Sequence, residues 1–77
     1  MPTIITANGY RIVIYPNDHA PPHVHVHHAD GMARVSIEPV PRLLSVHGLS
    51  AIQARRARAL VIEHREAALA VWRSLHG

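Results

Sequence analysis

Imidazole side chains are concentrated in the segment between residues 19 and 28. The histidines of this segment are His19, His23, His25, His27 and His28. Imidazole is a preferred ligand for zinc, nickel and copper, and its pKa lies close enough to neutrality for general acid–base chemistry. Any chemistry that the protein performs is therefore predicted to take place in or beside this segment.

Three of the histidines alternate with valines, as expected for a β-strand with one polar and one apolar face. The alternating run is His23, Val24, His25, Val26 and His27. Residues two apart on a strand lie about 6.5 Å apart on the same face, so the three imidazoles should form a row. A His-x-His pair of this kind can present two imidazoles to one metal ion, with Asp18 or His19 as a further ligand.

The sequence therefore predicts a candidate site for a divalent metal, zinc, nickel or copper. Its candidate ligands are Asp18, His19, His23, His25 and His27. Because the chain has no cysteine, a metal here would be held by imidazole and carboxylate groups alone. Three protein ligands would leave a coordination position open for water or substrate. Pro21 and Pro22 should stiffen the loop that carries the first ligands.

Two other interpretations of the same residues stay open. Two histidines near neutral pKa, with an arginine to stabilise a phosphorane, could cleave RNA without a metal. The candidates for such catalysis are His19, His23, His25, Arg11 and Arg34. Alternatively, the histidines form a solvated polar face with no site. The sequence leaves open whether the protein is an enzyme, and with no glycine-rich phosphate loop we expect no nucleotide cofactor.

Length and composition predict a single folded domain over residues 1–77. The net charge is +3 and all eight basic residues are arginines, which supports nucleic-acid binding only weakly. No apolar run approaches the roughly 20 residues needed to span a membrane, and the N-terminus lacks the features of a signal peptide. We expect a soluble, cytoplasmic protein with no membrane contact.

Two turn dipeptides predict two β-hairpins in a small antiparallel sheet. Asn8-Gly9 and Asp30-Gly31 both favour the positive φ angles of a tight hairpin turn. The first turn would place Ile5 opposite Ile12 and Ile4 opposite Val13, in what should be the more buried hairpin. The second would place Val26 opposite Val35, Val24 opposite Ile37, His27 opposite Arg34 and His25 opposite Ser36. The prolines of segment 39–41 should then close the sheet region.

A long C-terminal helix is predicted to cover this sheet and complete an α+β fold. Ser50 and Gln53 have the spacing of a capping box, and an apolar stripe keeps its helical phase from there to Gly77. The alternative is a helix split in two near Glu63-His64. The stripe should pack on the valine face of the second hairpin, which would leave His23, His25 and His27 on the opposite face.

The sequence resembles the DUF4160 family of small bacterial proteins over nearly its whole length. The most specific part is the string Asp-His-x-Pro-Pro-His-Val-His-Val, from Asp18 to Val26. Further matching segments are Gly9-Tyr10-Arg11, Asp30-Gly31, Glu38-Pro39, Glu63-His64-Arg65-Glu66 and Ala70-Val71-Trp72. The motif carries over to Asp18, His19, Pro21, Pro22, His23 and His25, whereas His27 and His28 lie where variation is expected.

The resemblance implies an interaction or regulatory role. Members of the family are often encoded beside the small DUF2442 family, in an arrangement attributed to toxin–antitoxin pairs. It therefore implies a small protein partner similar to DUF2442, self-association, or both. From the residues themselves, the alternative is a small hydrolase, in particular a ribonuclease that uses the histidine segment.

Overall fold

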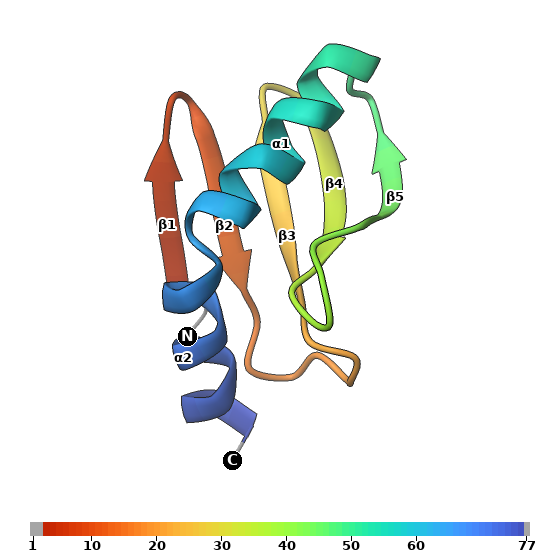
Figure 1. Ribbon diagram of the computed structural model, residues 1–77. Coiled ribbons are helices and arrows are strands. Elements are labelled where there is room, and N and C mark those ends of the chain that lie inside the picture. Colours follow the sequence, from red (N-terminus) through yellow and green to blue (C-terminus); the bar gives the residue numbers. More distant parts are fainter. Residues whose placement is uncertain (1–2, 77) are drawn as a thin grey trace.

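A computed structural model describes residues 3–76 of the chain, with five strands followed by two helices (Figure 1). The strands are β1 (Thr3–Ala7), β2 (Tyr10–Ile14), β3 (His23–His28), β4 (Gly31–Ser36) and β5 (Leu43–His47). The helices are α1 (Ala51–Glu63) and α2 (Arg65–His76). The predicted α+β class is confirmed, and neither of these helices is long and apolar enough to cross a membrane.

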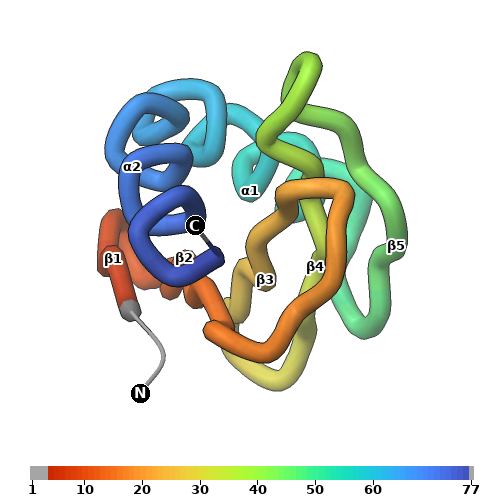
Figure 2. Tube along the Cα trace, turned by 90° about the horizontal axis from the view of Figure 1, so that it is seen from below, coloured from red at the N-terminus to blue at the C-terminus, as the bar shows by residue number. Residues whose placement is uncertain are grey.

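The five strands form one antiparallel sheet in the order β1-β2-β3-β4-β5. Each strand pairs with its neighbour in the sequence, so the sheet is a meander rather than two separate hairpins as predicted. Both helices lie on one side of the curved sheet (Figure 2), and no helix within residues 3–76 covers the opposite face. This two-layer arrangement buries one face of the sheet, which is what the alternating strand pattern requires.

The first predicted hairpin has the expected register. Ile5 pairs with Ile12 and Ile4 with Val13, and the turn residues Asn8 and Gly9 have φ angles of 53° and 79°. The expectation that this is the more buried hairpin is wrong. Because β1 is an edge strand, Ile4 is 52% exposed, whereas the central strands β2, β3 and β4 supply most of the sheet's buried residues.

The second hairpin has a register two residues away from the predicted one. Val24 pairs with Val35, Val26 with Ala33, His25 with Arg34, His27 with Met32 and His28 with Gly31. The turn is therefore formed by Ala29 and Asp30, with Ala29 in the left-handed region at φ 51°. A shift of two residues keeps every side chain on its predicted face.

Gly31 is required by crowding rather than by the turn. A Cβ atom added to it would collide with the carbonyl oxygen of Gly48 and with the side chain of Leu49. Gly31 opens β4 and Gly48 follows β5, so this close approach fixes where β5 lies against β4. The glycine of the Asp-Gly dipeptide is therefore needed for packing against Gly48 and Leu49. Statistics of turn sequences do not predict this requirement.

The proline segment 39–41 does not end the sheet, because the chain returns as β5. Buried Ser36 stabilises this return, since its hydroxyl donates to the carbonyl of Val40 at 2.7 Å and accepts from the amide of Arg42 at 2.9 Å. β5 pairs with β4 on one side only, and three of its apolar side chains are substantially exposed. These are Leu43, Leu44 and Val46.

The helical region begins as predicted but is divided. Ser50 and Gln53 form the reciprocal capping box, and α1 ends at Glu63 with His64 as its C-cap, where the φ and ψ angles are −104° and 17°. The prediction of one long helix is therefore wrong, and its alternative, a split near Glu63-His64, is confirmed. The predicted continuation to Gly77 lies outside the described residues.

Length explains why one straight helix does not fit. An uninterrupted helix over residues 51–76 would extend about 39 Å, more than the 34 Å longest dimension of the Cα trace. The break lets α1 contact β4 and β5 while α2 contacts β2. Arg58 and Arg65 fix the two helices to the β4–β5 connection, donating to the carbonyls of Pro41 at 3.0 Å and Ile37 at 2.9 Å.

The core lies between the helices and the inner face of the sheet. Its fully buried large side chains are Ile12, Ile14, Ile37, Val24, Val26, Val35 and Val61. Burial of each such side chain contributes about 1.5–3 kcal/mol. Trp72 of α2 is also buried. The valines of β3 thus hold that strand in place and determine the face on which its histidines lie.

We predict that Gly31→Ala destabilises the protein by about 2 kcal/mol or more, because its methyl group would overlap the backbone of Gly48. Urea unfolding measures this loss. Gly9→Ala is the comparison, since its Cβ would meet only His28 at 3.7 Å and its cost comes from the positive φ alone. An unchanged midpoint for Gly31→Ala would contradict the close approach of β4 and β5.

Candidate functional site

The candidate site lies where the β2–β3 connection meets the first residues of β3. Asp18 belongs to the connection, and its backbone is held at both ends. Its amide donates to the carbonyl of Tyr15 at 3.4 Å, and its carbonyl lies 2.9 Å from Nε2 of His76. The carboxylate of Asp18 is thereby directed over the outer face of β3, where His23 and His25 begin the strand.

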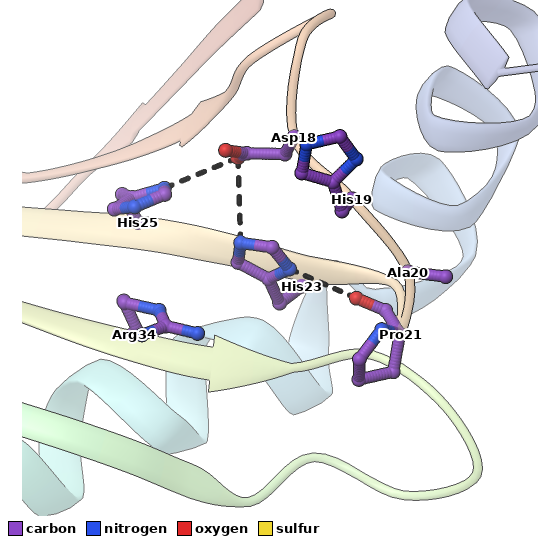
Figure 3. Close-up of a pocket in the computed structure, with 7 residues that line it drawn as sticks. All are labelled: Asp18, His19, Ala20, Pro21, His23, His25 and Arg34. Carbon is purple, nitrogen blue, oxygen red and sulfur yellow. Dashed lines mark hydrogen bonds and ion pairs between the residues drawn. The ribbon is translucent and has the colours of Figure 1, made fainter.

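Three potential ligand atoms converge at this point (Figure 3). Oδ2 of Asp18 lies 3.4 Å from Nε2 of His23 and 3.6 Å from Nδ1 of His25. All three atoms lie within 4.8 Å of one another. Oδ2 of Asp18 and Nδ1 of His25 are buried from solvent and have no hydrogen-bond partner. Two buried polar atoms therefore point towards each other without making a bond.

The separations suit metal ligands better than hydrogen-bonded groups. A hydrogen bond between an imidazole and a carboxylate would bring nitrogen and oxygen to about 2.7–2.9 Å. Two ligands at about 2.0–2.2 Å from a tetrahedral ion lie about 3.3–3.6 Å apart. The distances of 3.4 and 3.6 Å fall in this second range. These two separations fit a shared ion, and the three ligand atoms together lie within 4.8 Å of one another.

The ring of His23 is held in the orientation that a ligand needs. Its Nδ1 lies 2.8 Å from the carbonyl oxygen of Pro21, which can only accept, so Nδ1 carries a proton and Nε2 is the nitrogen that a neutral ring offers to a metal. Metal-binding histidines are commonly fixed by a carbonyl in this way. His23 is only 6% exposed, and its ring centroid lies 5.6 Å from that of Trp72 in α2.

The environment of His25 favours its neutral form. Burial lowers the pKa of His25 below its ordinary value, against the opposing effect of Asp18, and the charges of His23, Arg34 and His27 lower it further. Tyr15 packs edge-on against the ring, with the centroids 4.9 Å apart. A neutral imidazole is the form that binds metal, so the local electrostatics prepare His25 as a ligand.

A cavity of about 370 Å³ opens beside the three ligands. It is lined by Asp18, His19, Ala20, Pro21, His23, His25 and Arg34. His19 lies on the wall of this cavity, but its side chain is exposed and is not among the converging ligands. Arg34, which pairs with His25 across the β3–β4 ladder, forms the opposite side. The site therefore combines a potential metal position with open space next to it.

Two of the predicted site residues lie outside this cavity. His27 is on the same strand face as His25 but farther along β3, between Arg11 of β2 and Met32 of β4. The predicted row of three histidines thus contributes only its first two members to the cluster. The reason is that the loop carrying Asp18 reaches only the beginning of β3, so Arg11 and His27 have no carboxylate over them.

The sequence did not indicate the contribution of α2. His76 stacks on Trp72 with 3.7 Å between the ring centroids, and its Nε2 contacts the carbonyl of Asp18. The expectation that His23 faces away from the helices is therefore incomplete. Helix α2 extends along the end of the sheet, and its Trp72 lies against the ring of His23. A contact between residues 58 positions apart leaves no local pattern from which it could be predicted.

These features define a small α+β domain with a carboxylate and two imidazoles converging beside a cavity. The chain belongs to the family described as a domain of unknown function, DUF4160, whose model matches residues 9–73 and so includes the whole cluster. This confirms the family resemblance of the sequence. Comparison with curated proteins and with solved structures found no match.

We predict that the metal-free protein loses stability as the pH is lowered from 7.5 to 5. With the pKa of His25 lowered in the folded state, the unfolded chain binds a proton more readily. The stability from His25 is therefore present above about pH 6.5 and is lost as the pH falls through the folded-state pKa. Urea unfolding in the presence of a chelator should show a smaller loss for His25→Asn. Equal losses for the two proteins would contradict the prediction.

Proposed function

We propose that this protein is a metal-binding domain in which Asp18, His23 and His25 hold one divalent transition-metal ion. The proposal rests on one observation above all. The ligand atoms converge within 4.8 Å, and two of them are buried with no hydrogen-bond partner. Buried polar atoms are normally satisfied, and a bound ion would satisfy both at once.

Zinc, nickel and copper are the ions that the donor set supports. Imidazole suits all three, and the carboxylate adds one hard oxygen ligand that neutralises part of the charge. Three protein ligands leave at least one coordination position open, and all three ligand residues line the cavity. A water molecule on the ion could then act as a nucleophile, so metal-assisted hydrolysis is the chemistry that the site would support.

The metal-free ribonuclease alternative has less support from the geometry. Nε2 of His23 and Nδ1 of His25 are directed at Asp18, and Arg11 lies away from the cavity. General acid–base catalysis requires the imidazole nitrogens to reach the substrate. Arg34 is the only arginine among the residues lining this cavity.

We predict that untagged protein binds about one zinc or nickel ion per chain and that the ion raises its melting temperature. An ion that binds the folded state alone stabilises it by about 2.7 kcal/mol at a hundredfold excess over the dissociation constant. Elemental analysis and thermal melting measure the two effects. Asp18→Asn and the double variant His23→Ala, His25→Ala should lose both.

His27→Ala provides the matched control, since it removes an imidazole from the same strand face outside the cluster. It should retain the metal and the shift in melting temperature. Absence of metal from the parent, or an equal loss in His27→Ala, would refute the site as proposed.

We further propose that the protein binds a small partner, similar to DUF2442, through β5. The identity of the partner is inferred from the resemblance of the sequence to the DUF4160 family. The choice of β5 as the binding surface is supported by its position at an exposed edge of the sheet. β5 pairs only with β4, and Leu44 and Val46 are 44% and 39% exposed. An edge strand with apolar side chains favours the addition of a strand from another chain.

We predict that Leu44→Lys weakens the complex with the neighbouring DUF2442-like protein at least tenfold, because lysine opposes pairing at a sheet edge. Isothermal titration calorimetry measures the affinity. Ile62→Lys, which charges an exposed apolar position of α1, is the control and should bind normally. The double variant His23→Ala, His25→Ala should also bind. Equal weakening by Ile62→Lys would exclude β5 as the specific contact.

A further inference from the structure

Arg34 is a cation at the edge of the candidate metal site, and no partner for it lies within the described part of the chain. It lies opposite His25 on the neighbouring strand and lines the same cavity as the three ligands. Three other arginines have partners: Arg58 and Arg65 donate to carbonyls, and Arg73 lies 3.9 Å from Glu38. Within residues 3–76, Arg34 makes neither an ion pair nor a side-chain hydrogen bond.

The position of Arg34 creates a charge imbalance once a metal is bound. Asp18 is the only carboxylate among the residues that line the cavity. A divalent ion and a guanidinium together would exceed that single negative charge by two, beside an Asp18 oxygen and a His25 nitrogen that are both buried from solvent. A third group with negative charge is needed to balance the site.

We propose that the cavity binds an oxyanion, a phosphoryl or carboxylate group, that bridges the metal and the guanidinium of Arg34. The inference rests on the proposed metal site and names the class of ligand that this site takes. One oxygen would occupy the open coordination position, and the planar guanidinium would donate to the remaining oxygens. Arginine is well suited to this role because its donors match phosphate and carboxylate in pairs.

The shape of the site supports a ligand rather than a structural ion pair. Figure 3 shows Arg34 on β4 beside His23 and His25, with Asp18 on the far side of the two imidazoles. Arg34 is exposed and Asp18 Oδ2 is buried, and no ion pair joins them. The guanidinium is therefore free to contact a molecule that enters the cavity from solvent.

The test is titration of the zinc-loaded protein with inorganic phosphate and, separately, with acetate, in isothermal titration calorimetry. Excess zinc is removed first, and retained zinc is measured for every sample. At least one of the two anions should bind to the zinc-loaded parent, and the tighter one identifies the ligand as phosphoryl or carboxylate. The zinc-free protein should bind the same anion at least tenfold more weakly.

Arg34→Gln should weaken binding of the anion about tenfold or more, as expected for the loss of a charged hydrogen bond. It should retain zinc at least as well as the parent, because a neighbouring positive charge has been removed. Arg34→Lys should bind with intermediate affinity, since it keeps the charge but not the paired donors. Arg11→Gln, on the same sheet face but outside the cavity, should bind like the parent.

The outcomes separate the two proposals. A parent that retains no zinc overturns the proposed metal site, whatever the anions do. A parent that retains zinc but binds neither anion overturns only the bridging oxyanion. Binding that is unchanged in Arg34→Gln, or equally strong without zinc, overturns it as well.

Discussion

The arrangement of this protein around its candidate site depends on placing one carboxylate group against two imidazoles. Burial of a charge is costly unless neighbouring groups compensate for it, and Oδ2 of Asp18 has no hydrogen bond to do so. Nε2 of His23 and Nδ1 of His25 face this oxygen at 3.4 and 3.6 Å without a hydrogen bond to it, so the proposed metal ion is what would compensate the charge. Both rings must therefore be held firmly, and the surrounding elements do this in different ways.

The hydrophobic core supplies that rigidity through the alternation of β3. Val24 is fully buried under the helices, which forces the neighbouring residues His23 and His25 to the outer face of the strand. The end of the sheet is closed by α2, where Trp72 contacts the ring of His23 and His76 contacts the backbone of Asp18. The same helix thus packs the core and supports the loop that carries the carboxylate.

Local patterns were sufficient to predict the elements that sequence neighbours determine. The capping box at Ser50, the turn at Asn8-Gly9 and the inward valines of β3 follow from short-range chemistry. The five candidate ligands predicted from the sequence include the three whose ligand atoms converge, Asp18, His23 and His25, but also His19 and His27, which lie outside the cluster. The failures involve long-range packing. The apolar stripe keeps its phase through His64, so the sequence offered the break between α1 and α2 only as the alternative to one long helix. Similarly, Gly31 looks like a turn residue until β5 is placed against it.

The meander also bears on the order in which the protein folds. All three candidate ligands lie between residues 18 and 25, with Asp18 on the β2–β3 connection and His23 and His25 at the start of β3. Contacts between segments close in sequence form early, because little chain entropy is lost in bringing them together. The β2–β3 unit can therefore gather its ligands before α2 docks at the other end of the chain. Metal binding would then precede the docking of α2 beside the site. The ion could help to nucleate the sheet before it occupies the finished site.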